Sequence, residues 1–168
     1  MLFRSVKAEK TWKFSSKIQP TNEDYFEGTL LEHEGERYRI GVGQDDINIR
    51  KTQKQVHKIC TLTALAQTMQ SDTQEFKVVV GLPLMHYKNK EVREGFREYI
   101  LRPTIQTVRL NSTRKNIIIK DVLVFAQGGA ALYADPARKE EYKNSLVAVL
   151  DWGGLTINGF IADKLIPI

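Results

Sequence analysis

The sequence lacks most features that mark a secreted, metal-binding or membrane-spanning protein. Its single cysteine, Cys60, cannot form an internal disulfide and lies among apolar residues, which predicts a small buried side chain in a reducing cytoplasm. The three histidines are scattered, so no Cys/His cluster indicates zinc. No apolar run approaches the roughly 20 residues that span a bilayer, and the first residues lack the apolar core of a signal peptide. We therefore expect a cytoplasmic protein with no membrane partner.

Several motifs of catalysis and nucleotide binding are also missing. The sequence contains neither a G-x-x-x-x-G-K-[ST] loop nor a G-x-G-x-x-G fingerprint, so P-loop and dinucleotide-binding interpretations have no support. No serine lies in a G-x-S-x-G elbow, and no base accompanies the cysteine. Any catalytic site must therefore be built from other residues.

Composition and charge are those of a single globular domain over residues 1–168. The chain has 42% hydrophobic and 27% charged residues, a net charge of +5 and a pI near 9.3. Basic residues are interleaved with acidic ones, as in 88–98, which is typical of a solvated helix face. Residues 109–120 are basic without acids, but they lack aromatic side chains for base stacking. We therefore expect no direct contact with nucleic acid.

Apolar periodicity predicts an α/β fold. A hairpin is expected over 29–33 and 36–42, with its turn at Glu34-Gly35. Leu62, Leu65 and Ala66 lie on one face of a helix expected over 52–70. The remaining expectations are one or two strands in 3–20, a central and parallel strand at 76–82, a helix at 89–101 stopped by Arg102-Pro103, strands at 105–110 and 116–125, a short helix at 127–134 and a charged surface connection at 137–143. Helices that alternate with apolar strands favour packed α/β layers.

The first candidate site is the stretch 145–161. The apolar run Leu146–Leu150 predicts a strand buried on both faces, and it ends on Asp151 and the pair Gly153-Gly154, which predicts a hairpin. Nested N–H groups in a glycine turn bind phosphate, and a carboxylate beside them can hold hydrated Mg²⁺. The alternative is an ordinary hairpin in which Asp151 only satisfies the backbone of the turn.

The second candidate site is the segment 124–134. An apolar strand runs into Gln127, and small residues follow that would let a short helix pack closely. A glutamine at such a junction could orient an attacking water with its amide. The alternative is that Gln127 caps the helix or bonds to the backbone.

Together these two segments resemble the actin-like ATPase superfamily. Gln127-Gly-Gly-Ala-Ala-Leu-Tyr-Ala is similar to its first connecting helix, and Asp151-Trp-Gly-Gly-Leu-Thr to its second phosphate hairpin, D-x-G-G-x-T. Upstream, Phe14–Ile18, Tyr38–Gly43 and Val78–Leu84 are similar to the first domain of bacterial plasmid-segregation proteins of the ParM/StbA and Alp type. The resemblance covers roughly residues 12–168. It implies an RNase H-like α/β fold, a mixed sheet flanked by helices.

The resemblance also assigns roles to site residues. Asp151 would hold the water shell of Mg²⁺, and Gln127 would position the hydrolytic water. Gly153, Gly154 and Thr156 would surround the β- and γ-phosphates of ATP or GTP.

The sequence departs from the family pattern in two ways. Locally, Trp152 replaces an aliphatic residue, Leu155 stands where a third glycine is common, and Ala126 replaces a proline. More broadly, nothing before Trp12 fits the first phosphate hairpin, D-x-G-x-x-x-x-K, and a second, adenosine-holding domain is missing. We therefore expect a truncated first domain without its N-terminal strand pair, inactive as an ATPase alone.

The function implied for the full-length form is nucleotide-dependent polymerisation with copies of itself. The filaments would push or segregate plasmid DNA, which an adaptor protein would contact, and ATP would be hydrolysed slowly. One alternative is a catalytically inactive module that binds or caps actin-like filaments. Others are a fragment of a sugar-kinase or chaperone relative, and an unrelated basic nucleic-acid binder.

Overall fold

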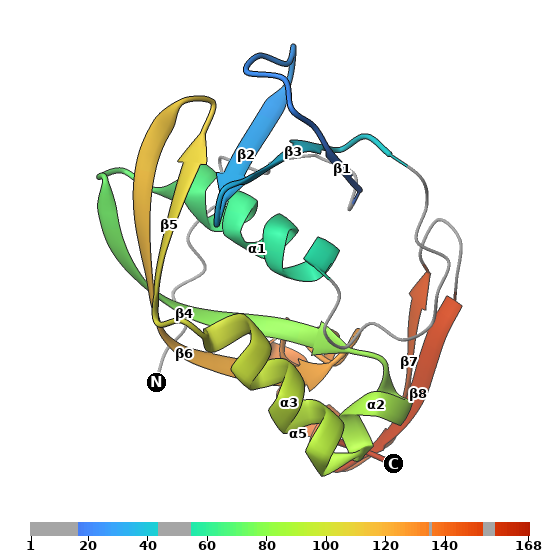
Figure 1. The fold of residues 1–168 in the computed structure, drawn as a ribbon. Helices are drawn as coiled ribbons and strands as arrows, with labels where there is room; N and C mark the ends of the chain where they lie inside the picture. The colour runs from blue at the N-terminus through green and yellow to red at the C-terminus, as the bar shows by residue number, and fades with distance from the viewer. Residues whose placement is uncertain (1–16, 44–54, 135, 153–156) are drawn as a thin grey trace. The chain divides into compact units, whose positions relative to one another are not determined.

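The computed structural model describes residues 17–43, 55–134, 136–152 and 157–168. Its elements are β1 (Ile18–Pro20), β2 (Thr29–His33), β3 (Glu36–Ile40), α1 (Gln55–Thr68), β4 (Thr73–Leu82), α2 (Leu84–Lys88), α3 (Lys90–Leu101), β5 (Ile105–Leu110), β6 (Thr113–Ala126), α4 (Ala131–Ala134), η1 (Pro136–Arg138), α5 (Lys139–Lys143), β7 (Leu146–Trp152), β8 (Ile157–Asp163) and β9 (Ile166–Pro167). Six strands form one sheet in the order β1-β3-β2-β5-β6-β4, and three form a second in the order β7-β8-β9 (Figure 1). The expected α/β class is confirmed.

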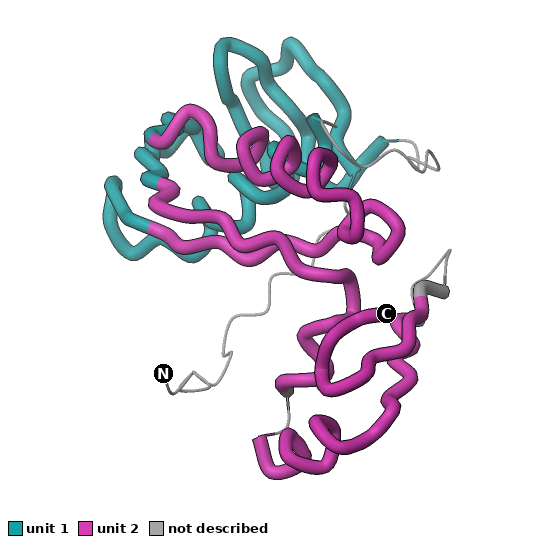
Figure 2. Tube along the Cα trace, turned by 90° about the horizontal axis from the view of Figure 1, so that it is seen from below, with its two compact units in different colours: residues 1–50, 54–75, 105–118 teal, residues 51–53, 76–104, 119–168 magenta. Residues whose placement is uncertain are grey.

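The chain divides into two compact units (Figure 2). The first comprises Met1–Arg50, Lys54–Glu75 and Ile105–Ile118, and the second comprises Lys51–Gln53, Phe76–Thr104 and Ile119–Ile168. The two long strands β4 and β6 each begin in the first unit and end in the second.

The first unit is built on the predicted hairpin. β2 pairs with β3 in antiparallel register from Thr29↔Ile40 to His33↔Glu36, and β5 pairs with the other side of β2. Glu34 and Gly35 both have positive φ, 53° and 83°. Two consecutive left-handed residues give a turn whose twist matches that of the strands it joins. The expected hairpin and the position of its turn are confirmed.

Helix α1 covers one face of this hairpin region. It contacts β1, β2 and β5 (Figure 1). Ile59, Leu62 and Ala66 are nearly inaccessible to solvent, as are Leu31 and Tyr38 on the strands. The expected helix is confirmed in its described part, and the apolar stripe at a spacing of three to four residues is the reason that it packs there.

The helix predicted over 89–101 is present in the second unit as α3. It follows β4 and the short helix α2 in the chain. The Asn89 side chain caps α3 by accepting a hydrogen bond from the Val92 N–H (3.2 Å). The helix ends at Leu101, before the predicted stop at Arg102-Pro103. Arg97 ties the helix to β6 because its Nε donates to the Val122 carbonyl (3.1 Å).

Strand β4 differs from its prediction. The expected central strand lies at one end of the order formed by the described strands. Val78 is buried, whereas its neighbour Val79 is 67% exposed, so only one face of the strand is covered here. A run of β-branched residues favours a strand, but it does not indicate whether that strand pairs with other strands on one side or on both sides.

Three local expectations are also corrected. The short helix begins only at Ala131, since Gly128 has a φ of 77° that a helix cannot contain. The segment 137–143 is not a plain connection but includes part of η1 and the helix α5. Helix α2, which follows Pro83, was not predicted.

The predicted hairpin in the stretch 145–161 is present, but one expectation about it is wrong. β7 pairs with β8 in antiparallel register, and the intervening residues 153–156 lie outside the described part of the chain. The strand was expected to be buried on both faces. Val149 is 8% exposed and packs with Leu132 and Phe160, but Leu150 is 72% exposed. One face of this sheet is therefore covered and the other is open.

Candidate functional site

The candidate site lies in the second unit, where β4, β6 and β7 end. Val122, Val124 and Ala126 alternate along β6 as buried residues and carry the chain to Gln127. The Gln127 backbone N–H donates to the Leu82 carbonyl at the end of β4 (2.7 Å). This bond fixes the backbone position of the glutamine.

The structure brings together two of the predicted site residues. The Gln127 Nε2 donates to the Asp151 Oδ2 over 3.2 Å, although the two residues are 24 positions apart. Both side chains are half-buried. Burial beside β6 and β7 reduces competition from water, which strengthens this bond relative to an exposed one.

Gly128 makes this approach possible and was missed as a site residue. Its φ of 77° lies in the left-handed region. A Cβ at this position would lie 3.2 Å from the Asp151 Cβ and 3.4 Å from the Val149 Cγ1. The sequence signal was the glycine directly after Gln127, which the prediction used only to explain close helix packing.

The other predicted ligands cannot be placed. Gly153, Gly154 and Thr156 lie outside the described residues. Among the residues that are described, no three His, Cys, Asp or Glu side chains converge on one point. Asp151 and Gln127 offer oxygen atoms, which suit Mg²⁺ held through its own waters. Gly128 leaves the Asp151 side chain uncrowded, where any larger residue would press against it.

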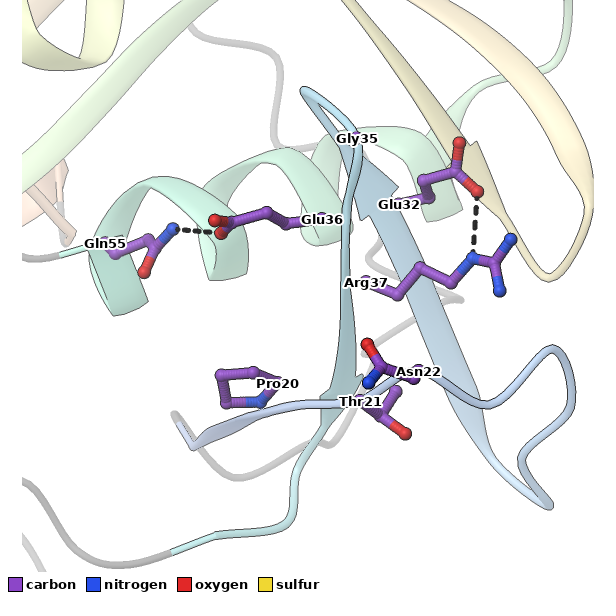
Figure 3. A pocket seen from close by; sticks show the side chains of 8 residues that line it. All are labelled: Pro20, Thr21, Asn22, Glu32, Gly35, Glu36, Arg37 and Gln55. Carbon is purple, nitrogen blue, oxygen red and sulfur yellow. Dashed lines mark hydrogen bonds and ion pairs between the residues drawn. The ribbon is translucent and has the colours of Figure 1, made fainter.

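A pocket in the first unit was not indicated by the sequence. It has a volume of about 530 Å³ and is lined by Pro20, Thr21, Asn22, Glu32, Gly35, Glu36, Arg37 and Gln55 (Figure 3). Arg37 donates from Nε to Glu32 (3.2 Å), and Gln55 donates from Nε2 to Glu36 (3.1 Å). Hydrogen bonds from the Tyr38 hydroxyl and from Gln55 hold the pKa of Glu36 below its usual value. Of the three charged side chains in the lining, Arg37 and Glu32 pair with each other, whereas Glu36 is held by hydrogen bonds from neutral groups.

Comparison with known proteins identifies the family. A sequence model of the N-terminal domain of actin-like proteins matches residues 3–129. The chain belongs to this family. The match includes Gln127 and stops before Asp151, so the contact between them adds information that the sequence model does not carry.

Solved structures agree with this assignment to the actin-like proteins. The chain is similar to the Alp12 filament structure, with 26% identity and a TM-score of 0.69 over 92% of this chain and 49% of that one. It also resembles the crystal structure of apo pSK41 ParM, with 17% identity and a TM-score of 0.72 over 92% of this chain and 56% of that one. AlfA from a Bacillus subtilis plasmid, solved as a filament, gives 16% identity and a TM-score of 0.62 over 92% of this chain and 59% of that one. The actin-like fold is confirmed.

The comparisons also set the extent of the likeness. The chain spans about half the length of these actin-like structures. A comparison with curated protein sequences gives no match. In the described residues, no helix is long and apolar enough to cross a membrane.

Proposed function

We propose that this chain supplies one side of the nucleotide site of a ParM-type, plasmid-segregating actin-like protein. The full-length form would bind ATP with Mg²⁺, hydrolyse it slowly and polymerise into filaments, linked to plasmid DNA by an adaptor protein. Membership of the actin-like family and the likeness to filament-forming plasmid proteins support this proposal.

The contact between Gln127 and Asp151 carries the proposal. Donation from the Gln127 Nε2 uses the amide nitrogen and leaves the Oε1 atom as an acceptor for a water hydrogen. The same bond restrains the orientation of the Asp151 carboxyl group. One side chain can then orient a water while the other faces the hydration shell of a cation.

A bound Mg²⁺ would neutralise phosphate charge at this place. The Asp151 carboxylate would accept hydrogen bonds from its waters, and Gln127 would hold the attacking water. Gly128 would keep the Asp151 side chain uncrowded. Gly153, Gly154 and Thr156 are proposed to supply backbone and hydroxyl groups to the phosphates.

The isolated chain should bind nucleotide weakly and turn it over no faster than background. It spans about half the length of its relatives, so it offers part of the contacts that a complete site would make. Losing several kcal/mol of binding free energy lowers affinity by about three decades or more.

Titration of the isotope-labelled chain with ATP, followed by nuclear magnetic resonance, tests the proposal. In the presence of Mg²⁺ we expect ATP to shift the signals of Gln127 and Asp151, with a Kd of roughly millimolar. Removing Mg²⁺ with a chelator should reduce the shifts. Phosphate release should stay at background.

Two matched variants distinguish this site from non-specific binding. Asp151→Ala should abolish the Mg²⁺-dependent shifts, whereas Asp163→Ala, which removes a carboxylate from β8 at the far end of the strand pair, should leave them unchanged. Equal behaviour of the two variants would contradict the proposed site. ATP turnover by the isolated chain that is lost in Asp151→Ala would refute its predicted inactivity.

A further inference from the structure

Three aromatic rings meet at the end of β6 in the second unit. The Phe125 ring contacts the Tyr133 ring of α4 edge-on, with 5.8 Å between centroids and 71° between planes. It contacts the Tyr87 ring of α2 at 6.2 Å and 53°. Edge-on and tilted arrangements are favourable for aromatic pairs. The rings thus join α2, β6 and α4 at the point where the chain reaches Gln127.

The chain makes a tight turn directly after Phe125. The Gly129 N–H donates to the Ala126 carbonyl (2.8 Å), which closes a four-residue turn with Gln127 and Gly128 at its two central positions. The φ of Gly128 is 77°, whereas that of Gln127 is not positive. A positive φ at the third residue alone is typical of a type II turn, which favours glycine there. Gln127 therefore lies at the corner of a turn with a defined backbone.

The Phe125 ring restrains this turn at its last residue. An added Cβ at Gly129 would lie 2.7 Å from Cε1 and 2.9 Å from Cδ1 of the ring, so the ring rests directly on the glycine. The carbonyl at the end of β4 restrains the turn at Gln127, and Asp151 restrains it at Gly128. Each of the last three residues of the turn thus has its own neighbour.

The ring is itself held from α2 and α3. Arg93 donates from Nη1 to the Tyr87 carbonyl (2.6 Å), and its guanidinium carbon lies 5.2 Å from the centroid of the Tyr87 ring. A guanidinium over an aromatic face is attracted to it. Tyr87 is therefore fixed by its backbone and by its ring, and it passes this restraint to Phe125.

We infer that Phe125 is a positioning residue for Gln127. The inference rests on the proposed function, in which the Gln127 Oε1 orients a water while its Nε2 donates to Asp151. An amide rotated by half a turn would present its nitrogen to the water and its oxygen to the carboxylate. Misplacing such a group by about 1 Å lowers a reaction rate about 100-fold. By resting on Gly129, the ring keeps the turn, and with it the amide, in one orientation.

Nuclear magnetic resonance relaxation of the isotope-labelled chain without nucleotide tests this role. In the original chain we expect an order parameter of about 0.8 for the Gln127 side-chain amide. Phe125→Leu keeps an apolar side chain but removes the ring, and it should lower this value below about 0.6, the flexible range. The backbone order parameters of β7 and β8 should stay unchanged, which a general loss of stability would not allow.

Leu123→Ala is the matched control. Leu123 lies two residues before Phe125, on the same side of β6, and is 56% exposed. This variant should leave the order of the Gln127 amide unchanged. Equal order in the original chain and in Phe125→Leu would overturn the role. A loss of order in Leu123→Ala as large as that in Phe125→Leu would overturn it as well.

A second variant guards against misfolding of β6. Tyr87→Leu leaves that strand unaltered and removes the ring that supports Phe125, so it should lower the same order parameter by a smaller amount. Circular dichroism should show that all three variants keep the original secondary structure. An unchanged Gln127 amide in Tyr87→Leu would overturn the part assigned to α2.

Titration with Mg²⁺ and ATP separates this role from the proposed function. In Phe125→Leu the Asp151 signal should still shift, whereas the shift of the Gln127 side-chain amide should be lost. Equal shifts of that amide in Phe125→Leu and the original chain would contradict the positioning role. If ATP shifts neither residue in the original chain, the nucleotide site is wrong, while the order parameters still decide whether the ring fixes the amide.

Discussion

The two sheets bury their apolar side chains in different ways. In the first unit, helix α1 lies over the hairpin region, and residues such as Leu31 and Tyr38 are almost inaccessible to solvent. In the β7-β8-β9 sheet one face is covered and the other exposes Leu146 and Leu150. Apolar residues in a strand therefore do not contribute equally to stability. What decides their contribution is whether another element covers them.

The largest expected effect comes from removing a covered side chain. Leu62→Ala in α1 should lower the free energy of unfolding by about 2–5 kcal/mol, because a cavity would remain among buried neighbours. Leu150→Ala, on the open face, should change it by less than about 0.5 kcal/mol. Urea denaturation at low protein concentration measures both values without a contribution from association. Similar losses for the two variants would show that covered and uncovered apolar side chains contribute equally to stability.

A second prediction sharpens the comparison at the site. Gly128→Ala should destabilise the chain by about 1–3 kcal/mol, since alanine is strained at a φ of 77° and its Cβ would crowd the Asp151 side chain. Gly95→Ala is the control in α3, where an added Cβ meets no atom within 4 Å. It should stabilise by about 0.5–1 kcal/mol through helix propensity. The same denaturation measurement reports both, and a neutral Gly128→Ala would show that the turn is not constrained.

The smallest expected effect is a pH dependence in the first unit. Burial lowers the pKa of His33 below its usual value of 6.5, and the nearby charge of Lys58 lowers it further. The charge of Glu34 and a hydrogen bond with the Gln106 side chain raise this pKa, but by less than burial lowers it. The unfolded chain then binds the proton more readily than the folded one. Stability is therefore complete above about pH 6.5 and is lost as the pH falls through the folded pKa. Denaturation midpoints at pH 7.5 and 5 should differ less in His33→Gln than in the original chain.

His86→Gln is the control for this measurement, because His86 lies in α2 of the second unit and is not among the buried residues. It should keep the original pH dependence. If His33→Gln keeps it as well, the loss of stability in acid arises from other groups.

Elements with local signals were predictable from the sequence. Glu34-Gly35 specified the first hairpin, and Arg102-Pro103 marked the end of α3. The turn at Gly128 was not predictable, since small residues after a strand also suit a helix. The exposure of Leu150 was not predictable either. Whether a strand is buried depends on residues far away in the sequence that pack against it, and a run of apolar residues does not show where those lie.

The candidate site was predictable only in part. Gln127 and Asp151 were singled out separately, each with an alternative explanation, and only the resemblance to actin-like proteins joined them. The two residues are 24 positions apart in the sequence, and no helix or strand period relates positions at that distance. Their proximity therefore could not be inferred from the sequence pattern. The pocket beside Arg37 had no signal at all, because its lining residues come from separate turns and strands.

The amide at position 127 cannot be exchanged for an acid of the same shape. A glutamate there would bring two negative oxygens to the distance now spanned by a donor and an acceptor, 3.2 Å. Like charges at this distance repel each other, so the contact that joins the end of β6 to the end of β7 would be lost. The amide nitrogen of one side chain is thus what makes the approach of these two strand ends attractive.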